Sequence, residues 1–474
     1  MEQHLLAGQV VPAEGSREVR GTNPSTGQPG TALIAATREE VAAAVATADV
    51  ARGVWRRTPP AQRAAALQEA ARVVRADAQH LGEVLSAETG RLLGEARGSA
   101  EVAADLLAEA AVTGLLAAGR NLAGDPGAVD VVRREPRGVV AVLTPWNDPY
   151  PAAAGLLAAA LVMGNTVVHK PSERSAAAGW ELAVRISQCL PDGVLNVLTG
   201  DGAVGAAVAA DPRVHVVAQV GSTTTGRAIA ATVGARGGRV LLENGGKDPI
   251  LVDAGVNPRW AAQQIATGAF TNAGQLCTSV ERVYLHSDVS DAVISALLAI
   301  AETMVVGDPA DPASDLGPMV DERQLQVVAE QVDAAVAAGA QCLTGGARLD
   351  RPGSWYPPTV LTGCTPDMAV LTEETFGPVA AIVVVADFEE GLELAEAGAH
   401  GLAATVLTPR MDHALRAAEH LEVGTVKVNA VFGGAPGGSA DPRRASGSGP
   451  GFGPALLGEL SALKAVHLEP APPA

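Results

Sequence analysis

Short runs of β-branched and aliphatic residues alternate with alanine-rich segments along residues 138–243, and this alternation constrains the fold more than any other feature of the chain. The apolar runs are GVVAVL, TVVHK, VLNVL, VHVVAQV and RVLLE, separated by helical patterns at 151–163, 175–189, 201–210 and 224–235. Strands that alternate with helices in this way predict right-handed β-α-β crossovers and a mostly parallel sheet. Such sheets bind their ligands at the carboxyl ends of the strands.

Further helical patterns and a second α/β series flank this region. Apolar positions recur at helical spacing over 38–52, 60–85 and 94–119, after a short predicted strand at 5–11. The second series contains the runs ERVYLH, AAIVVV, AATVL and GTVKVN and the helical patterns 288–303, 323–338, 389–398 and 411–420. It predicts a separate α/β domain.

Two isolated strands are also predicted, one within residues 121–137 and one in the C-terminal LSALKAVHLEP. Lone strands are unstable, so we expect these two to pair with each other or with a second subunit. Residues 431–454 contain eight Gly and four Pro in 24 residues, which predicts a loop too flexible to belong to the core.

Charge and composition exclude several classes of function. The 474 residues carry 34 Lys and Arg against 52 Asp and Glu, a formal charge of −18, which excludes a nucleic-acid clamp because phosphates need a basic face. Aromatic residues make up only 3% and hydrophobic residues 47%, which argues against an aromatic-lined groove and against intrinsic disorder. The N-terminus has no basic stretch followed by a long apolar run, so we expect no signal peptide and a cytoplasmic location.

Cys277 stands out among four scattered cysteines. The cysteines form no CxxC pair, which argues against a disulfide framework and predicts no metal site. Most lone cysteines are small buried hydrophobes. Asn272, Gly274 and Gln275 precede Cys277 at the apparent end of a helix, however, and an inert buried thiol has no need of such neighbours. Because a thiolate nucleophile needs partial exposure and nearby donors, Cys277 is a candidate nucleophile.

Glu243 and Asn147 each follow a predicted strand. Glu243 ends the run RVLLE, and a carboxylate in a partly apolar pocket has a raised pKa and can act as a general base on water. Asn147 lies in TPWNDP, where two prolines stiffen the turn and the side-chain amide could donate to a developing oxyanion. A solvated strand-end acid and an ordinary turn asparagine are the alternative interpretations.

Two more strand ends have residues suited to a dinucleotide. Lys170 and Glu173, in HKPSE, could hydrogen-bond ribose hydroxyls, and the carboxylate would repel a phosphate on that ribose, which favours NAD over NADP. The turn GSTTTG (221–226) precedes a helix and differs from the G-x-G-x-x-G fingerprint. A helix N-terminus there nevertheless suits a pyrophosphate.

In this order, these elements resemble the aldehyde dehydrogenase superfamily over nearly the whole chain. The matching pieces are NPSTG (23–27), TPWN (144–147), KPSE (170–173), GST (221–223), LE-x-GGK (242–247), GQLC (274–277), EETFGP (373–378), VN (428–429) and SGSG (446–449). The GQLC-TSVER and LE-x-GGKDP stretches resemble the succinate-semialdehyde-like branch.

The resemblance implies an α/β fold with three parts, and a protein that assembles into oligomers. A Rossmann-type NAD-binding domain would comprise 1–120 and 138–244, and an α/β catalytic domain would comprise 245–450. A small β element for oligomerisation would comprise 121–137 and 455–474, in a homodimer or homotetramer.

The family resemblance also implies a mechanism. Cys277 would attack the aldehyde carbon, and the oxyanion would be held by the Asn147 side chain and the backbone N–H of Cys277. Hydride transfer would leave a thioester, which Glu243 would hydrolyse by activating water. The CoA-acylating branch typically lacks this base, so Glu243 favours release of a free carboxylate.

The cofactor residues follow from the same resemblance. The expected contacts are Lys170 and Glu173 on the adenosine ribose, Gly221 and Ser222 on the pyrophosphate, Trp146 near the cofactor, and Glu374 and Phe376 on the nicotinamide ribose. A surface acid is the alternative interpretation of Glu374.

The chain departs from the family pattern in three places. Asp148 replaces a common aromatic that typically faces the substrate tunnel, which indicates a polar or cationic aldehyde, or a displaced loop. With so few aromatics, we expect a tunnel that is wider or more polar than usual. Asn244 replaces the usual Leu beside the base, where it could alter how the base is held. Residues 439–444 lengthen the C-terminal loop, where Arg443 and Arg444 either contact a substrate carboxylate or, as we favour, are solvated.

Two other functions stay open at this point. One is a cofactor-binding protein with little dehydrogenase activity, in which Asp148 and the altered loop have closed the site. The other is a thiol esterase that uses Cys277 and Glu243 without a cofactor.

Overall fold

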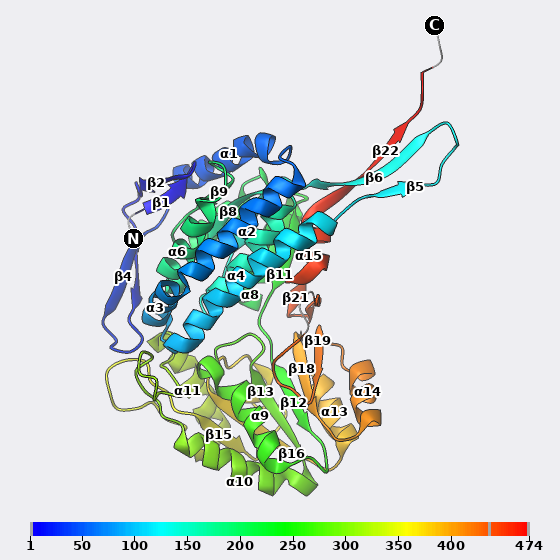
Figure 1. The fold of residues 1–474 in the computed structure, drawn as a ribbon. Helices are drawn as coiled ribbons and strands as arrows, with labels where there is room; N and C mark the ends of the chain where they lie inside the picture. Colours follow the sequence, from blue (N-terminus) through cyan, green and yellow to red (C-terminus); the bar gives the residue numbers. More distant parts are fainter. Residues whose placement is uncertain (1–2, 435–437, 472–474) are drawn as a thin grey trace.

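The fold consists of two large sheets covered by helices and a narrow three-stranded arm (Figure 1). This is a computed structural model, and it describes residues 3–434 and 438–471. The α/β class and the mostly parallel sheets confirm the fold predicted from the sequence. Within the described ranges, no helix is both long and apolar enough to cross a membrane.

The first sheet has five parallel strands at its centre, and short antiparallel strands extend it at both edges. Its order is β2 (Gln9–Pro12), β1 (Gln3–Leu6), β9 (Leu195–Val197), β8 (Thr166–Lys170), β7 (Val139–Leu143), β10 (Val214–Val220), β11 (Arg239–Glu243) and β21 (Gly447–Ser448). The register sets Lys170 beside Leu143, Leu143 beside Gln219, and Val220 beside Glu243. The carboxyl ends of these strands therefore form one continuous edge.

Helices cover both faces of this sheet because its strands are apolar on both sides. The covering helices are α1 (Arg38–Trp55), α2 (Pro60–Ala76), α3 (Ala78–Thr89), α4 (Leu93–Leu116), α5 (Pro149–Val162), α6 (Ala176–Ser187), α7 (Gly202–Ala210) and α8 (Thr223–Ala235). Val140 faces a core that includes Leu107 and Leu157, whereas the neighbouring Val139 faces Val45 and the opposite helices. Such continuous burial is typical of parallel strands with helices on both faces.

The second sheet has the order β14 (Gln341–Thr344), β15 (Thr359–Thr362), β16 (Val379–Val385), β13 (Val280–His286), β12 (Asp248–Val252), β18 (Ala403–Leu407) and β19 (Thr425–Val428). Its helices are α9 (Pro258–Phe270), α10 (Ser287–Thr303), α11 (Glu322–Ala337), α12 (Ala369–Thr372), α13 (Phe388–Glu396) and α14 (Met411–His420). The chain passes directly from β11 of the first sheet to β12 of the second, so residues 244–247 connect the two.

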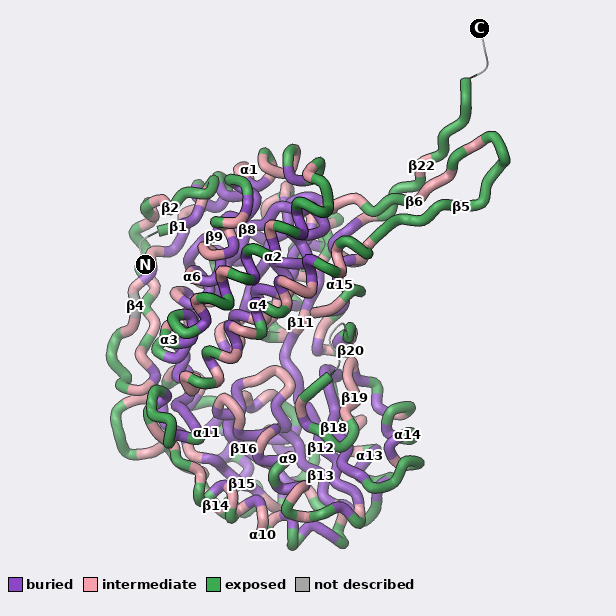
Figure 2. The backbone as a smooth tube through the Cα atoms, in the orientation of Figure 1, coloured by how far each residue is buried: buried purple, intermediate pink, exposed green. Residues whose placement is uncertain are grey.

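The arm consists of β5 (Arg120–Leu122), β6 (Val129–Pro136) and β22 (Ser461–Leu468). Both predicted isolated strands are present, and they pair with each other in antiparallel register from Pro136 beside Ser461 to Val129 beside Leu468. The arm projects from the body, and most of its residues are exposed (Figures 1 and 2). Helix α15 (Gly453–Glu459) leads into it.

Three details of the predicted secondary structure are wrong. The strand at 5–11 is a hairpin, β1–β2, because Ala7 and Gly8 turn the chain with φ of 52° and 76°. The helix at 60–85 is two helices, separated at Asp77. The hairpin of β3 (Glu18–Thr22) with β4 (Pro29–Ile34) was not predicted.

The Gly-rich segment 431–454 also differs from its prediction. Residues 435–437 of this segment lie outside the described residues. The part around Ser446 and Gly451 is buried, β21 extends the first sheet, and β20 (Arg443–Arg444) pairs with β17 (His400–Gly401). This half of the segment, here called the strap, is packed because it bonds to the backbone of β11 in the first sheet and to that of β17.

Candidate active site

The loop before Cys277 has an unusual backbone. After α9 ends at Phe270, Asn272, Ala273 and Gly274 all adopt left-handed conformations, with φ of 53°, 54° and 69°. A Cβ atom on Gly274 would lie 2.0 Å from the carbonyl oxygen of Gly377, so only glycine fits. The chain reverses tightly here and presents Cys277, whose side chain is partly buried.

Asn147 lies against this loop. It is buried, and its side-chain amide donates a hydrogen bond to the backbone carbonyl of Gln275, 3.0 Å away. In the described part of the chain, the backbone N–H of Cys277 makes no hydrogen bond. One amide N–H of Asn147 and the N–H of Cys277 thus remain available as donors beside the thiol.

Glu243 ends β11 at the same edge of the sheet. Burial raises the pKa of its carboxyl to about 7. No hydrogen bond or ion pair among the described residues holds this carboxyl. A Cβ atom on Gly451 would lie 2.3 Å from the Glu243 carboxyl carbon, so the C-terminal strap passes directly over the group. A carboxyl with this pKa can accept a proton from water near neutral pH.

The environment of Cys277 keeps its thiol protonated. Burial, and then the nearby carboxylates of Glu243, Asp248, Asp148 and Glu374, raise the pKa of Cys277 above its usual range. Like charges nearby disfavour the thiolate form of the cysteine.

Lys170 and Glu173 lie together at the end of β8. The Lys170 ammonium is buried, donates to the carbonyl of Gly200 at 2.9 Å, and lies 3.4 Å from Glu173 Oε2. The Glu173 side chain is 37% exposed, so its carboxylate can still accept hydrogen bonds from a ligand. The structure thus brings these two predicted residues together.

Gly221 and Ser222 lie at the N-terminus of α8. The Ser222 hydroxyl caps the helix by accepting from the Thr225 N–H at 3.3 Å, and it is exposed. Gly221 donates to the carbonyl of Glu243 at 2.9 Å, which links this turn to β11. Free N–H groups at a helix N-terminus attract anions.

Trp146 and Phe376 bring the two sheets into contact. Their rings meet edge to face, with centroids 5.5 Å apart, and Phe376 has a φ of 52°. Its N–H donates to Glu281, which also pairs with Lys247 at 2.6 Å. Glu374 accepts from the Gly246 N–H at 3.1 Å. The residues predicted on the cofactor side therefore lie on facing elements of the two sheets.

This donor set fits a nicotinamide dinucleotide. A partly exposed carboxylate, Glu173, suits ribose hydroxyls, and the N-terminus of α8 suits a diphosphate. Burial and the neighbouring Glu281 raise the pKa of Glu374 to about 7.

The positions that depart from the family pattern have partners within the protein. Asp148 is half-buried and is bonded by Arg91 and Ser99. Asn244 donates to the carbonyl of Ala445 at 3.0 Å and so ties the strap to the end of β11. Arg444 pairs with Glu396 and Glu422, whereas Arg443 is exposed in β20.

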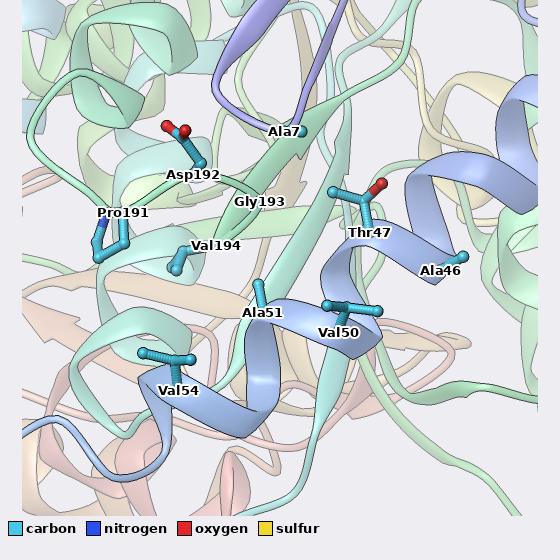
Figure 3. A pocket seen from close by; sticks show the side chains of 10 residues that line it. All are labelled: Ala7, Ala46, Thr47, Val50, Ala51, Val54, Pro191, Asp192, Gly193 and Val194. Carbon is cyan, nitrogen blue, oxygen red and sulfur yellow. The ribbon is translucent and has the colours of Figure 1, made fainter.

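A cavity of about 520 Å³ lies elsewhere in the molecule, between α1 and residues 191–194 (Figure 3). Its lining is mostly Ala and Val, with Asp192 as the one acid. The Thr166 hydroxyl at the start of β8 bonds to Ala48 of α1, so this cavity adjoins the amino ends of the strands, opposite to Cys277. Apart from Asp192, no ionisable side chain among the described residues lines this cavity, so it is not the candidate active site.

Sequence reasoning missed three residues of the site. Arg91 contacts Asp148, Gln275 provides the carbonyl that orients Asn147, and Gly451 faces Glu243. From the sequence, Gln275 is recognisable only as a polar neighbour of Cys277. No local pattern distinguishes Arg91 or Gly451, because their partners are distant in the sequence.

Comparison with known proteins decides the family. The model of the aldehyde dehydrogenase family matches residues 10–466. The chain belongs to this family. It is 36% identical to an alpha-ketoglutarate semialdehyde dehydrogenase of Haloferax volcanii, with 90% of each chain covered. It is 34% identical to a succinate-semialdehyde dehydrogenase, NADP(+) 1, of Mycobacterium tuberculosis, with 86% of this chain and 90% of that protein covered.

A solved structure gives the same result for the fold. The crystal structure of an NAD-dependent aldehyde dehydrogenase from Sinorhizobium meliloti superposes with a TM-score of 0.96 at 34% identity, covering 100% of this chain and 95% of that one. The aldehyde dehydrogenase is therefore an oxidoreductase, and its relatives include both an NAD-dependent and an NADP-dependent protein. The family predicted from the sequence motifs is confirmed.

Proposed function

We propose that this aldehyde dehydrogenase oxidises an aldehyde to the carboxylic acid through a covalent bond to Cys277, with NAD as hydride acceptor. The observation that carries the proposal is the Asn147–Gln275 hydrogen bond of 3.0 Å, which holds a side-chain amide beside the loop of Cys277. An amide in this place can stabilise negative charge that develops on the substrate oxygen.

In the first half-reaction, the Cys277 sulfur bonds to the aldehyde carbon, the carbonyl oxygen takes the negative charge, and the thiol proton passes to solvent. The Asn147 amide and the Cys277 backbone N–H donate to the resulting oxyanion. When bound, the dinucleotide supplies the hydride acceptor. Loss of hydride from the former aldehyde carbon leaves an acyl group on the Cys277 sulfur as a thioester.

In the second half-reaction, Glu243 removes a proton from water as the water oxygen bonds to the thioester carbon. The carbon–sulfur bond then breaks, the acid leaves, and the proton returns to the sulfur. The Glu243 pKa of about 7 suits both the uptake and the return of the proton. A carboxyl without a fixed partner can move between these tasks.

The cofactor side of the proposal rests on Lys170, Glu173, Gly221, Ser222, Trp146, Glu374 and Phe376. We propose that Glu173 and Lys170 bind the adenosine ribose, because their carboxylate and ammonium lie 3.4 Å apart at the end of β8. A phosphate on that ribose would meet the Glu173 carboxylate, so we propose a preference for NAD over NADP. We propose that Gly221 and Ser222 bind the diphosphate, that Trp146 lies near the cofactor, and that Glu374 and Phe376 bind the nicotinamide ribose.

We propose a polar or carboxylated aldehyde as the substrate. Two relatives are named for semialdehydes of dicarboxylic acids, and the chain is 36% and 34% identical to them. Aromatic residues are scarce in this chain, at 3%, which suits a polar tunnel. Asp148, directly after Asn147, has partners within the protein, Arg91 and Ser99.

This proposal assigns a role to each part of the chain. Residues 1–120 and 138–244 would bind NAD, residues 245–450 would carry the nucleophile, and 121–137 with 455–474 would hold subunits together. The exposed apolar side chains Leu122, Val129, Leu463 and Leu468 of the arm support an oligomer, a homodimer or homotetramer. Sedimentation of the full chain measures the subunit number, and a monomer would contradict this part of the proposal.

An aldehyde panel tests the function. NADH formation by wild type and by Cys277→Ala is measured with aliphatic, aromatic, carboxylated and amino aldehydes. We expect wild type to have its highest kcat/KM with a carboxylated aldehyde. We expect Cys277→Ala to form no NADH with any of them. No NADH from any aldehyde despite NAD binding would favour a cofactor-binding protein. Ester cleavage that needs no cofactor, without aldehyde oxidation, would favour a thiol esterase.

A further inference from the structure

A partly buried ion pair outside the proposed catalytic groups joins three segments around Asn147. Arg91 lies between α3 and α4, and its Nη1 is 2.5 Å from Asp148 Oδ1 and 3.5 Å from the Asn147 carbonyl oxygen. The Ser99 hydroxyl of α4 donates to the same Asp148 oxygen at 2.6 Å. The turn that carries Asn147 is thus fastened to α4 immediately after the asparagine.

We propose that Arg91 is a positioning residue that acts through Asp148 to hold the Asn147 amide against the Cys277 loop. This inference rests on the proposed function, in which Asn147 stabilises the oxyanion. Arg91 touches neither substrate nor cofactor in this account. Its effect on the reaction passes through the backbone of residues 147–148.

The other side of Asn147 is fastened to the Cys277 loop. The Asn272 amide donates to the Asn147 carbonyl at 3.2 Å and to the Gln275 carbonyl at 3.3 Å. The Asn147 amide donates in turn to the Gln275 carbonyl at 3.0 Å. Arg91 and Asn272 also line one small hollow, together with Gly90 and Ala273. Arg91 and Asn272, from two different segments, therefore both donate hydrogen bonds to the backbone carbonyl of Asn147.

The ion pair between Arg91 and Asp148 is sufficiently buried from solvent that removal of one partner should cost free energy. The Arg91 side chain is only 10% exposed and that of Asp148 is 33% exposed. Removal of one partner of such a pair leaves the other charge without compensation, which costs more than an exposed ion pair contributes. Arg91 can reach both Asp148 and the Asn147 carbonyl because its guanidinium presents a planar fork of donors, which a lysine lacks.

The remaining partner of Arg91 is weaker. Glu95 Oε2 lies 3.6 Å from Arg91 Nε, beyond hydrogen-bond distance, and both atoms are buried without a hydrogen bond in the described part of the chain. Burial raises the pKa of Glu95. The hydrogen bonds of the Arg91 guanidinium in this region therefore go to Asp148 and to the Asn147 carbonyl, as expected of a group that fixes this turn.

A positioning role and a substrate contact at Asp148 predict different kinetics. Every aldehyde forms the same oxyanion, so displacement of Asn147 slows acylation for all aldehydes by a similar factor. A substrate contact would change KM for charged aldehydes only. The two roles are separable with aldehydes of different charge.

The test compares Arg91→Met, Arg91→Lys and Asp148→Asn with wild type. Single-turnover NADH formation, with enzyme in excess over the aldehyde, measures acylation, and titration with NAD measures cofactor binding. Arg185→Met is the matched control, because Arg185 is 15% exposed and pairs with Asp77 and with Glu181 four residues earlier, away from the site. Thermal melting of all variants monitors folding.

We expect Arg91→Met and Asp148→Asn to slow acylation about tenfold or more for every aldehyde, with NAD binding within about twofold of wild type. Arg91→Lys should recover part of the rate, and Arg185→Met should leave it unchanged. An unchanged acylation rate in Arg91→Met, an equal loss in Arg185→Met, or an effect confined to charged aldehydes would overturn the proposal. Wild-type enzyme that forms no NADH in a single turnover would overturn the proposed function and this inference together. If Arg91→Met does not fold, Asp148→Asn, which keeps the side-chain shape, decides.

Discussion

The side-chain amide of Asn147 and the backbone carbonyl of Gln275 are 3.0 Å apart and joined by a hydrogen bond. The two residues come from different sheets, since Asn147 follows β7 and Gln275 follows α9. This bond leaves one N–H of the amide for another acceptor and sets its direction. A donor held before the substrate arrives needs no reorganisation during the reaction, which makes it effective.

Asn147→Ala should lower kcat by about 10²- to 10³-fold, the usual effect of losing one oxyanion donor. KM for NAD should change little, because the residue lies on the Cys277 side. Steady-state kinetics with both substrates measure the two effects. Gln62→Ala, which removes an exposed side-chain amide on α2, is the control. A kcat within about threefold of wild type would show that Asn147 is no oxyanion donor.

Glu243→Gln should stop turnover after the first half-reaction. The amide cannot take a proton from water, so thioester hydrolysis should fall by about 10²- to 10⁴-fold while single-turnover NADH formation remains. Rapid mixing with NADH absorbance separates the two steps. Equal loss of both steps would mean that Glu243 acts before the thioester forms.

The pH dependence follows from the raised pKa of Glu243, about 7. Hydrolysis needs the ionised form, so its rate should rise with pH up to about 7 and then level off. The folded protein keeps this proton to higher pH than the unfolded chain, so this group makes unfolding easier as pH rises through about 7. The melting temperature of Glu243→Gln minus that of wild type should therefore be larger at pH 8 than at pH 5. A pH-independent difference in melting temperature would contradict the raised pKa.

Gly451→Ala should impair the same step by crowding the base. A Cβ atom there would lie 2.3 Å from the Glu243 carboxyl carbon, so the carboxyl must move. We expect hydrolysis to slow by about tenfold or more, with acylation nearly unchanged. Gly98→Ala, whose new Cβ meets nothing within 4 Å, is the control. Wild-type hydrolysis in Gly451→Ala would show that Glu243 works from another position.

Glu173→Ser should relax the preference for NAD. Removing the carboxylate removes the repulsion of a ribose phosphate, so kcat/KM with NADP should rise by about tenfold relative to NAD. Glu39→Ser, on the exposed face of α1, controls for the change in net charge. A wild-type enzyme that already prefers NADP would refute the assignment.

The fold was largely predictable because each element has a local cause. The β-branched runs ending at Leu143, Lys170, Val220 and Glu243 became neighbouring parallel strands. The prediction failed where a backbone turn decides the structure, as at Ala7 and Gly8, since alternation alone does not show where a strand reverses.

The site was only partly predictable, for a different reason. Strand ends and a polar loop mark Asn147, Glu243 and Cys277 as candidates, each with an alternative interpretation, and only the family resemblance joins them into one predicted site. Arg91 and Gly451 act on partners 57 and 208 residues away, at Asp148 and Glu243, and neither has a local pattern. The prediction of a flexible strap failed because tertiary bonds such as Asn244 to Ala445 fix it.

The central claim is an acyl group on the Cys277 sulfur. Glu243→Gln enzyme is mixed with NAD and aldehyde, quenched in acid, and measured by intact mass and peptide mapping. The account predicts a mass increase equal to the bound acyl group, located on the peptide containing Cys277 and absent from the Cys277→Ala, Glu243→Gln double variant. NADH formation at the wild-type rate by Cys277→Ala, or an acyl group on another residue, would contradict it.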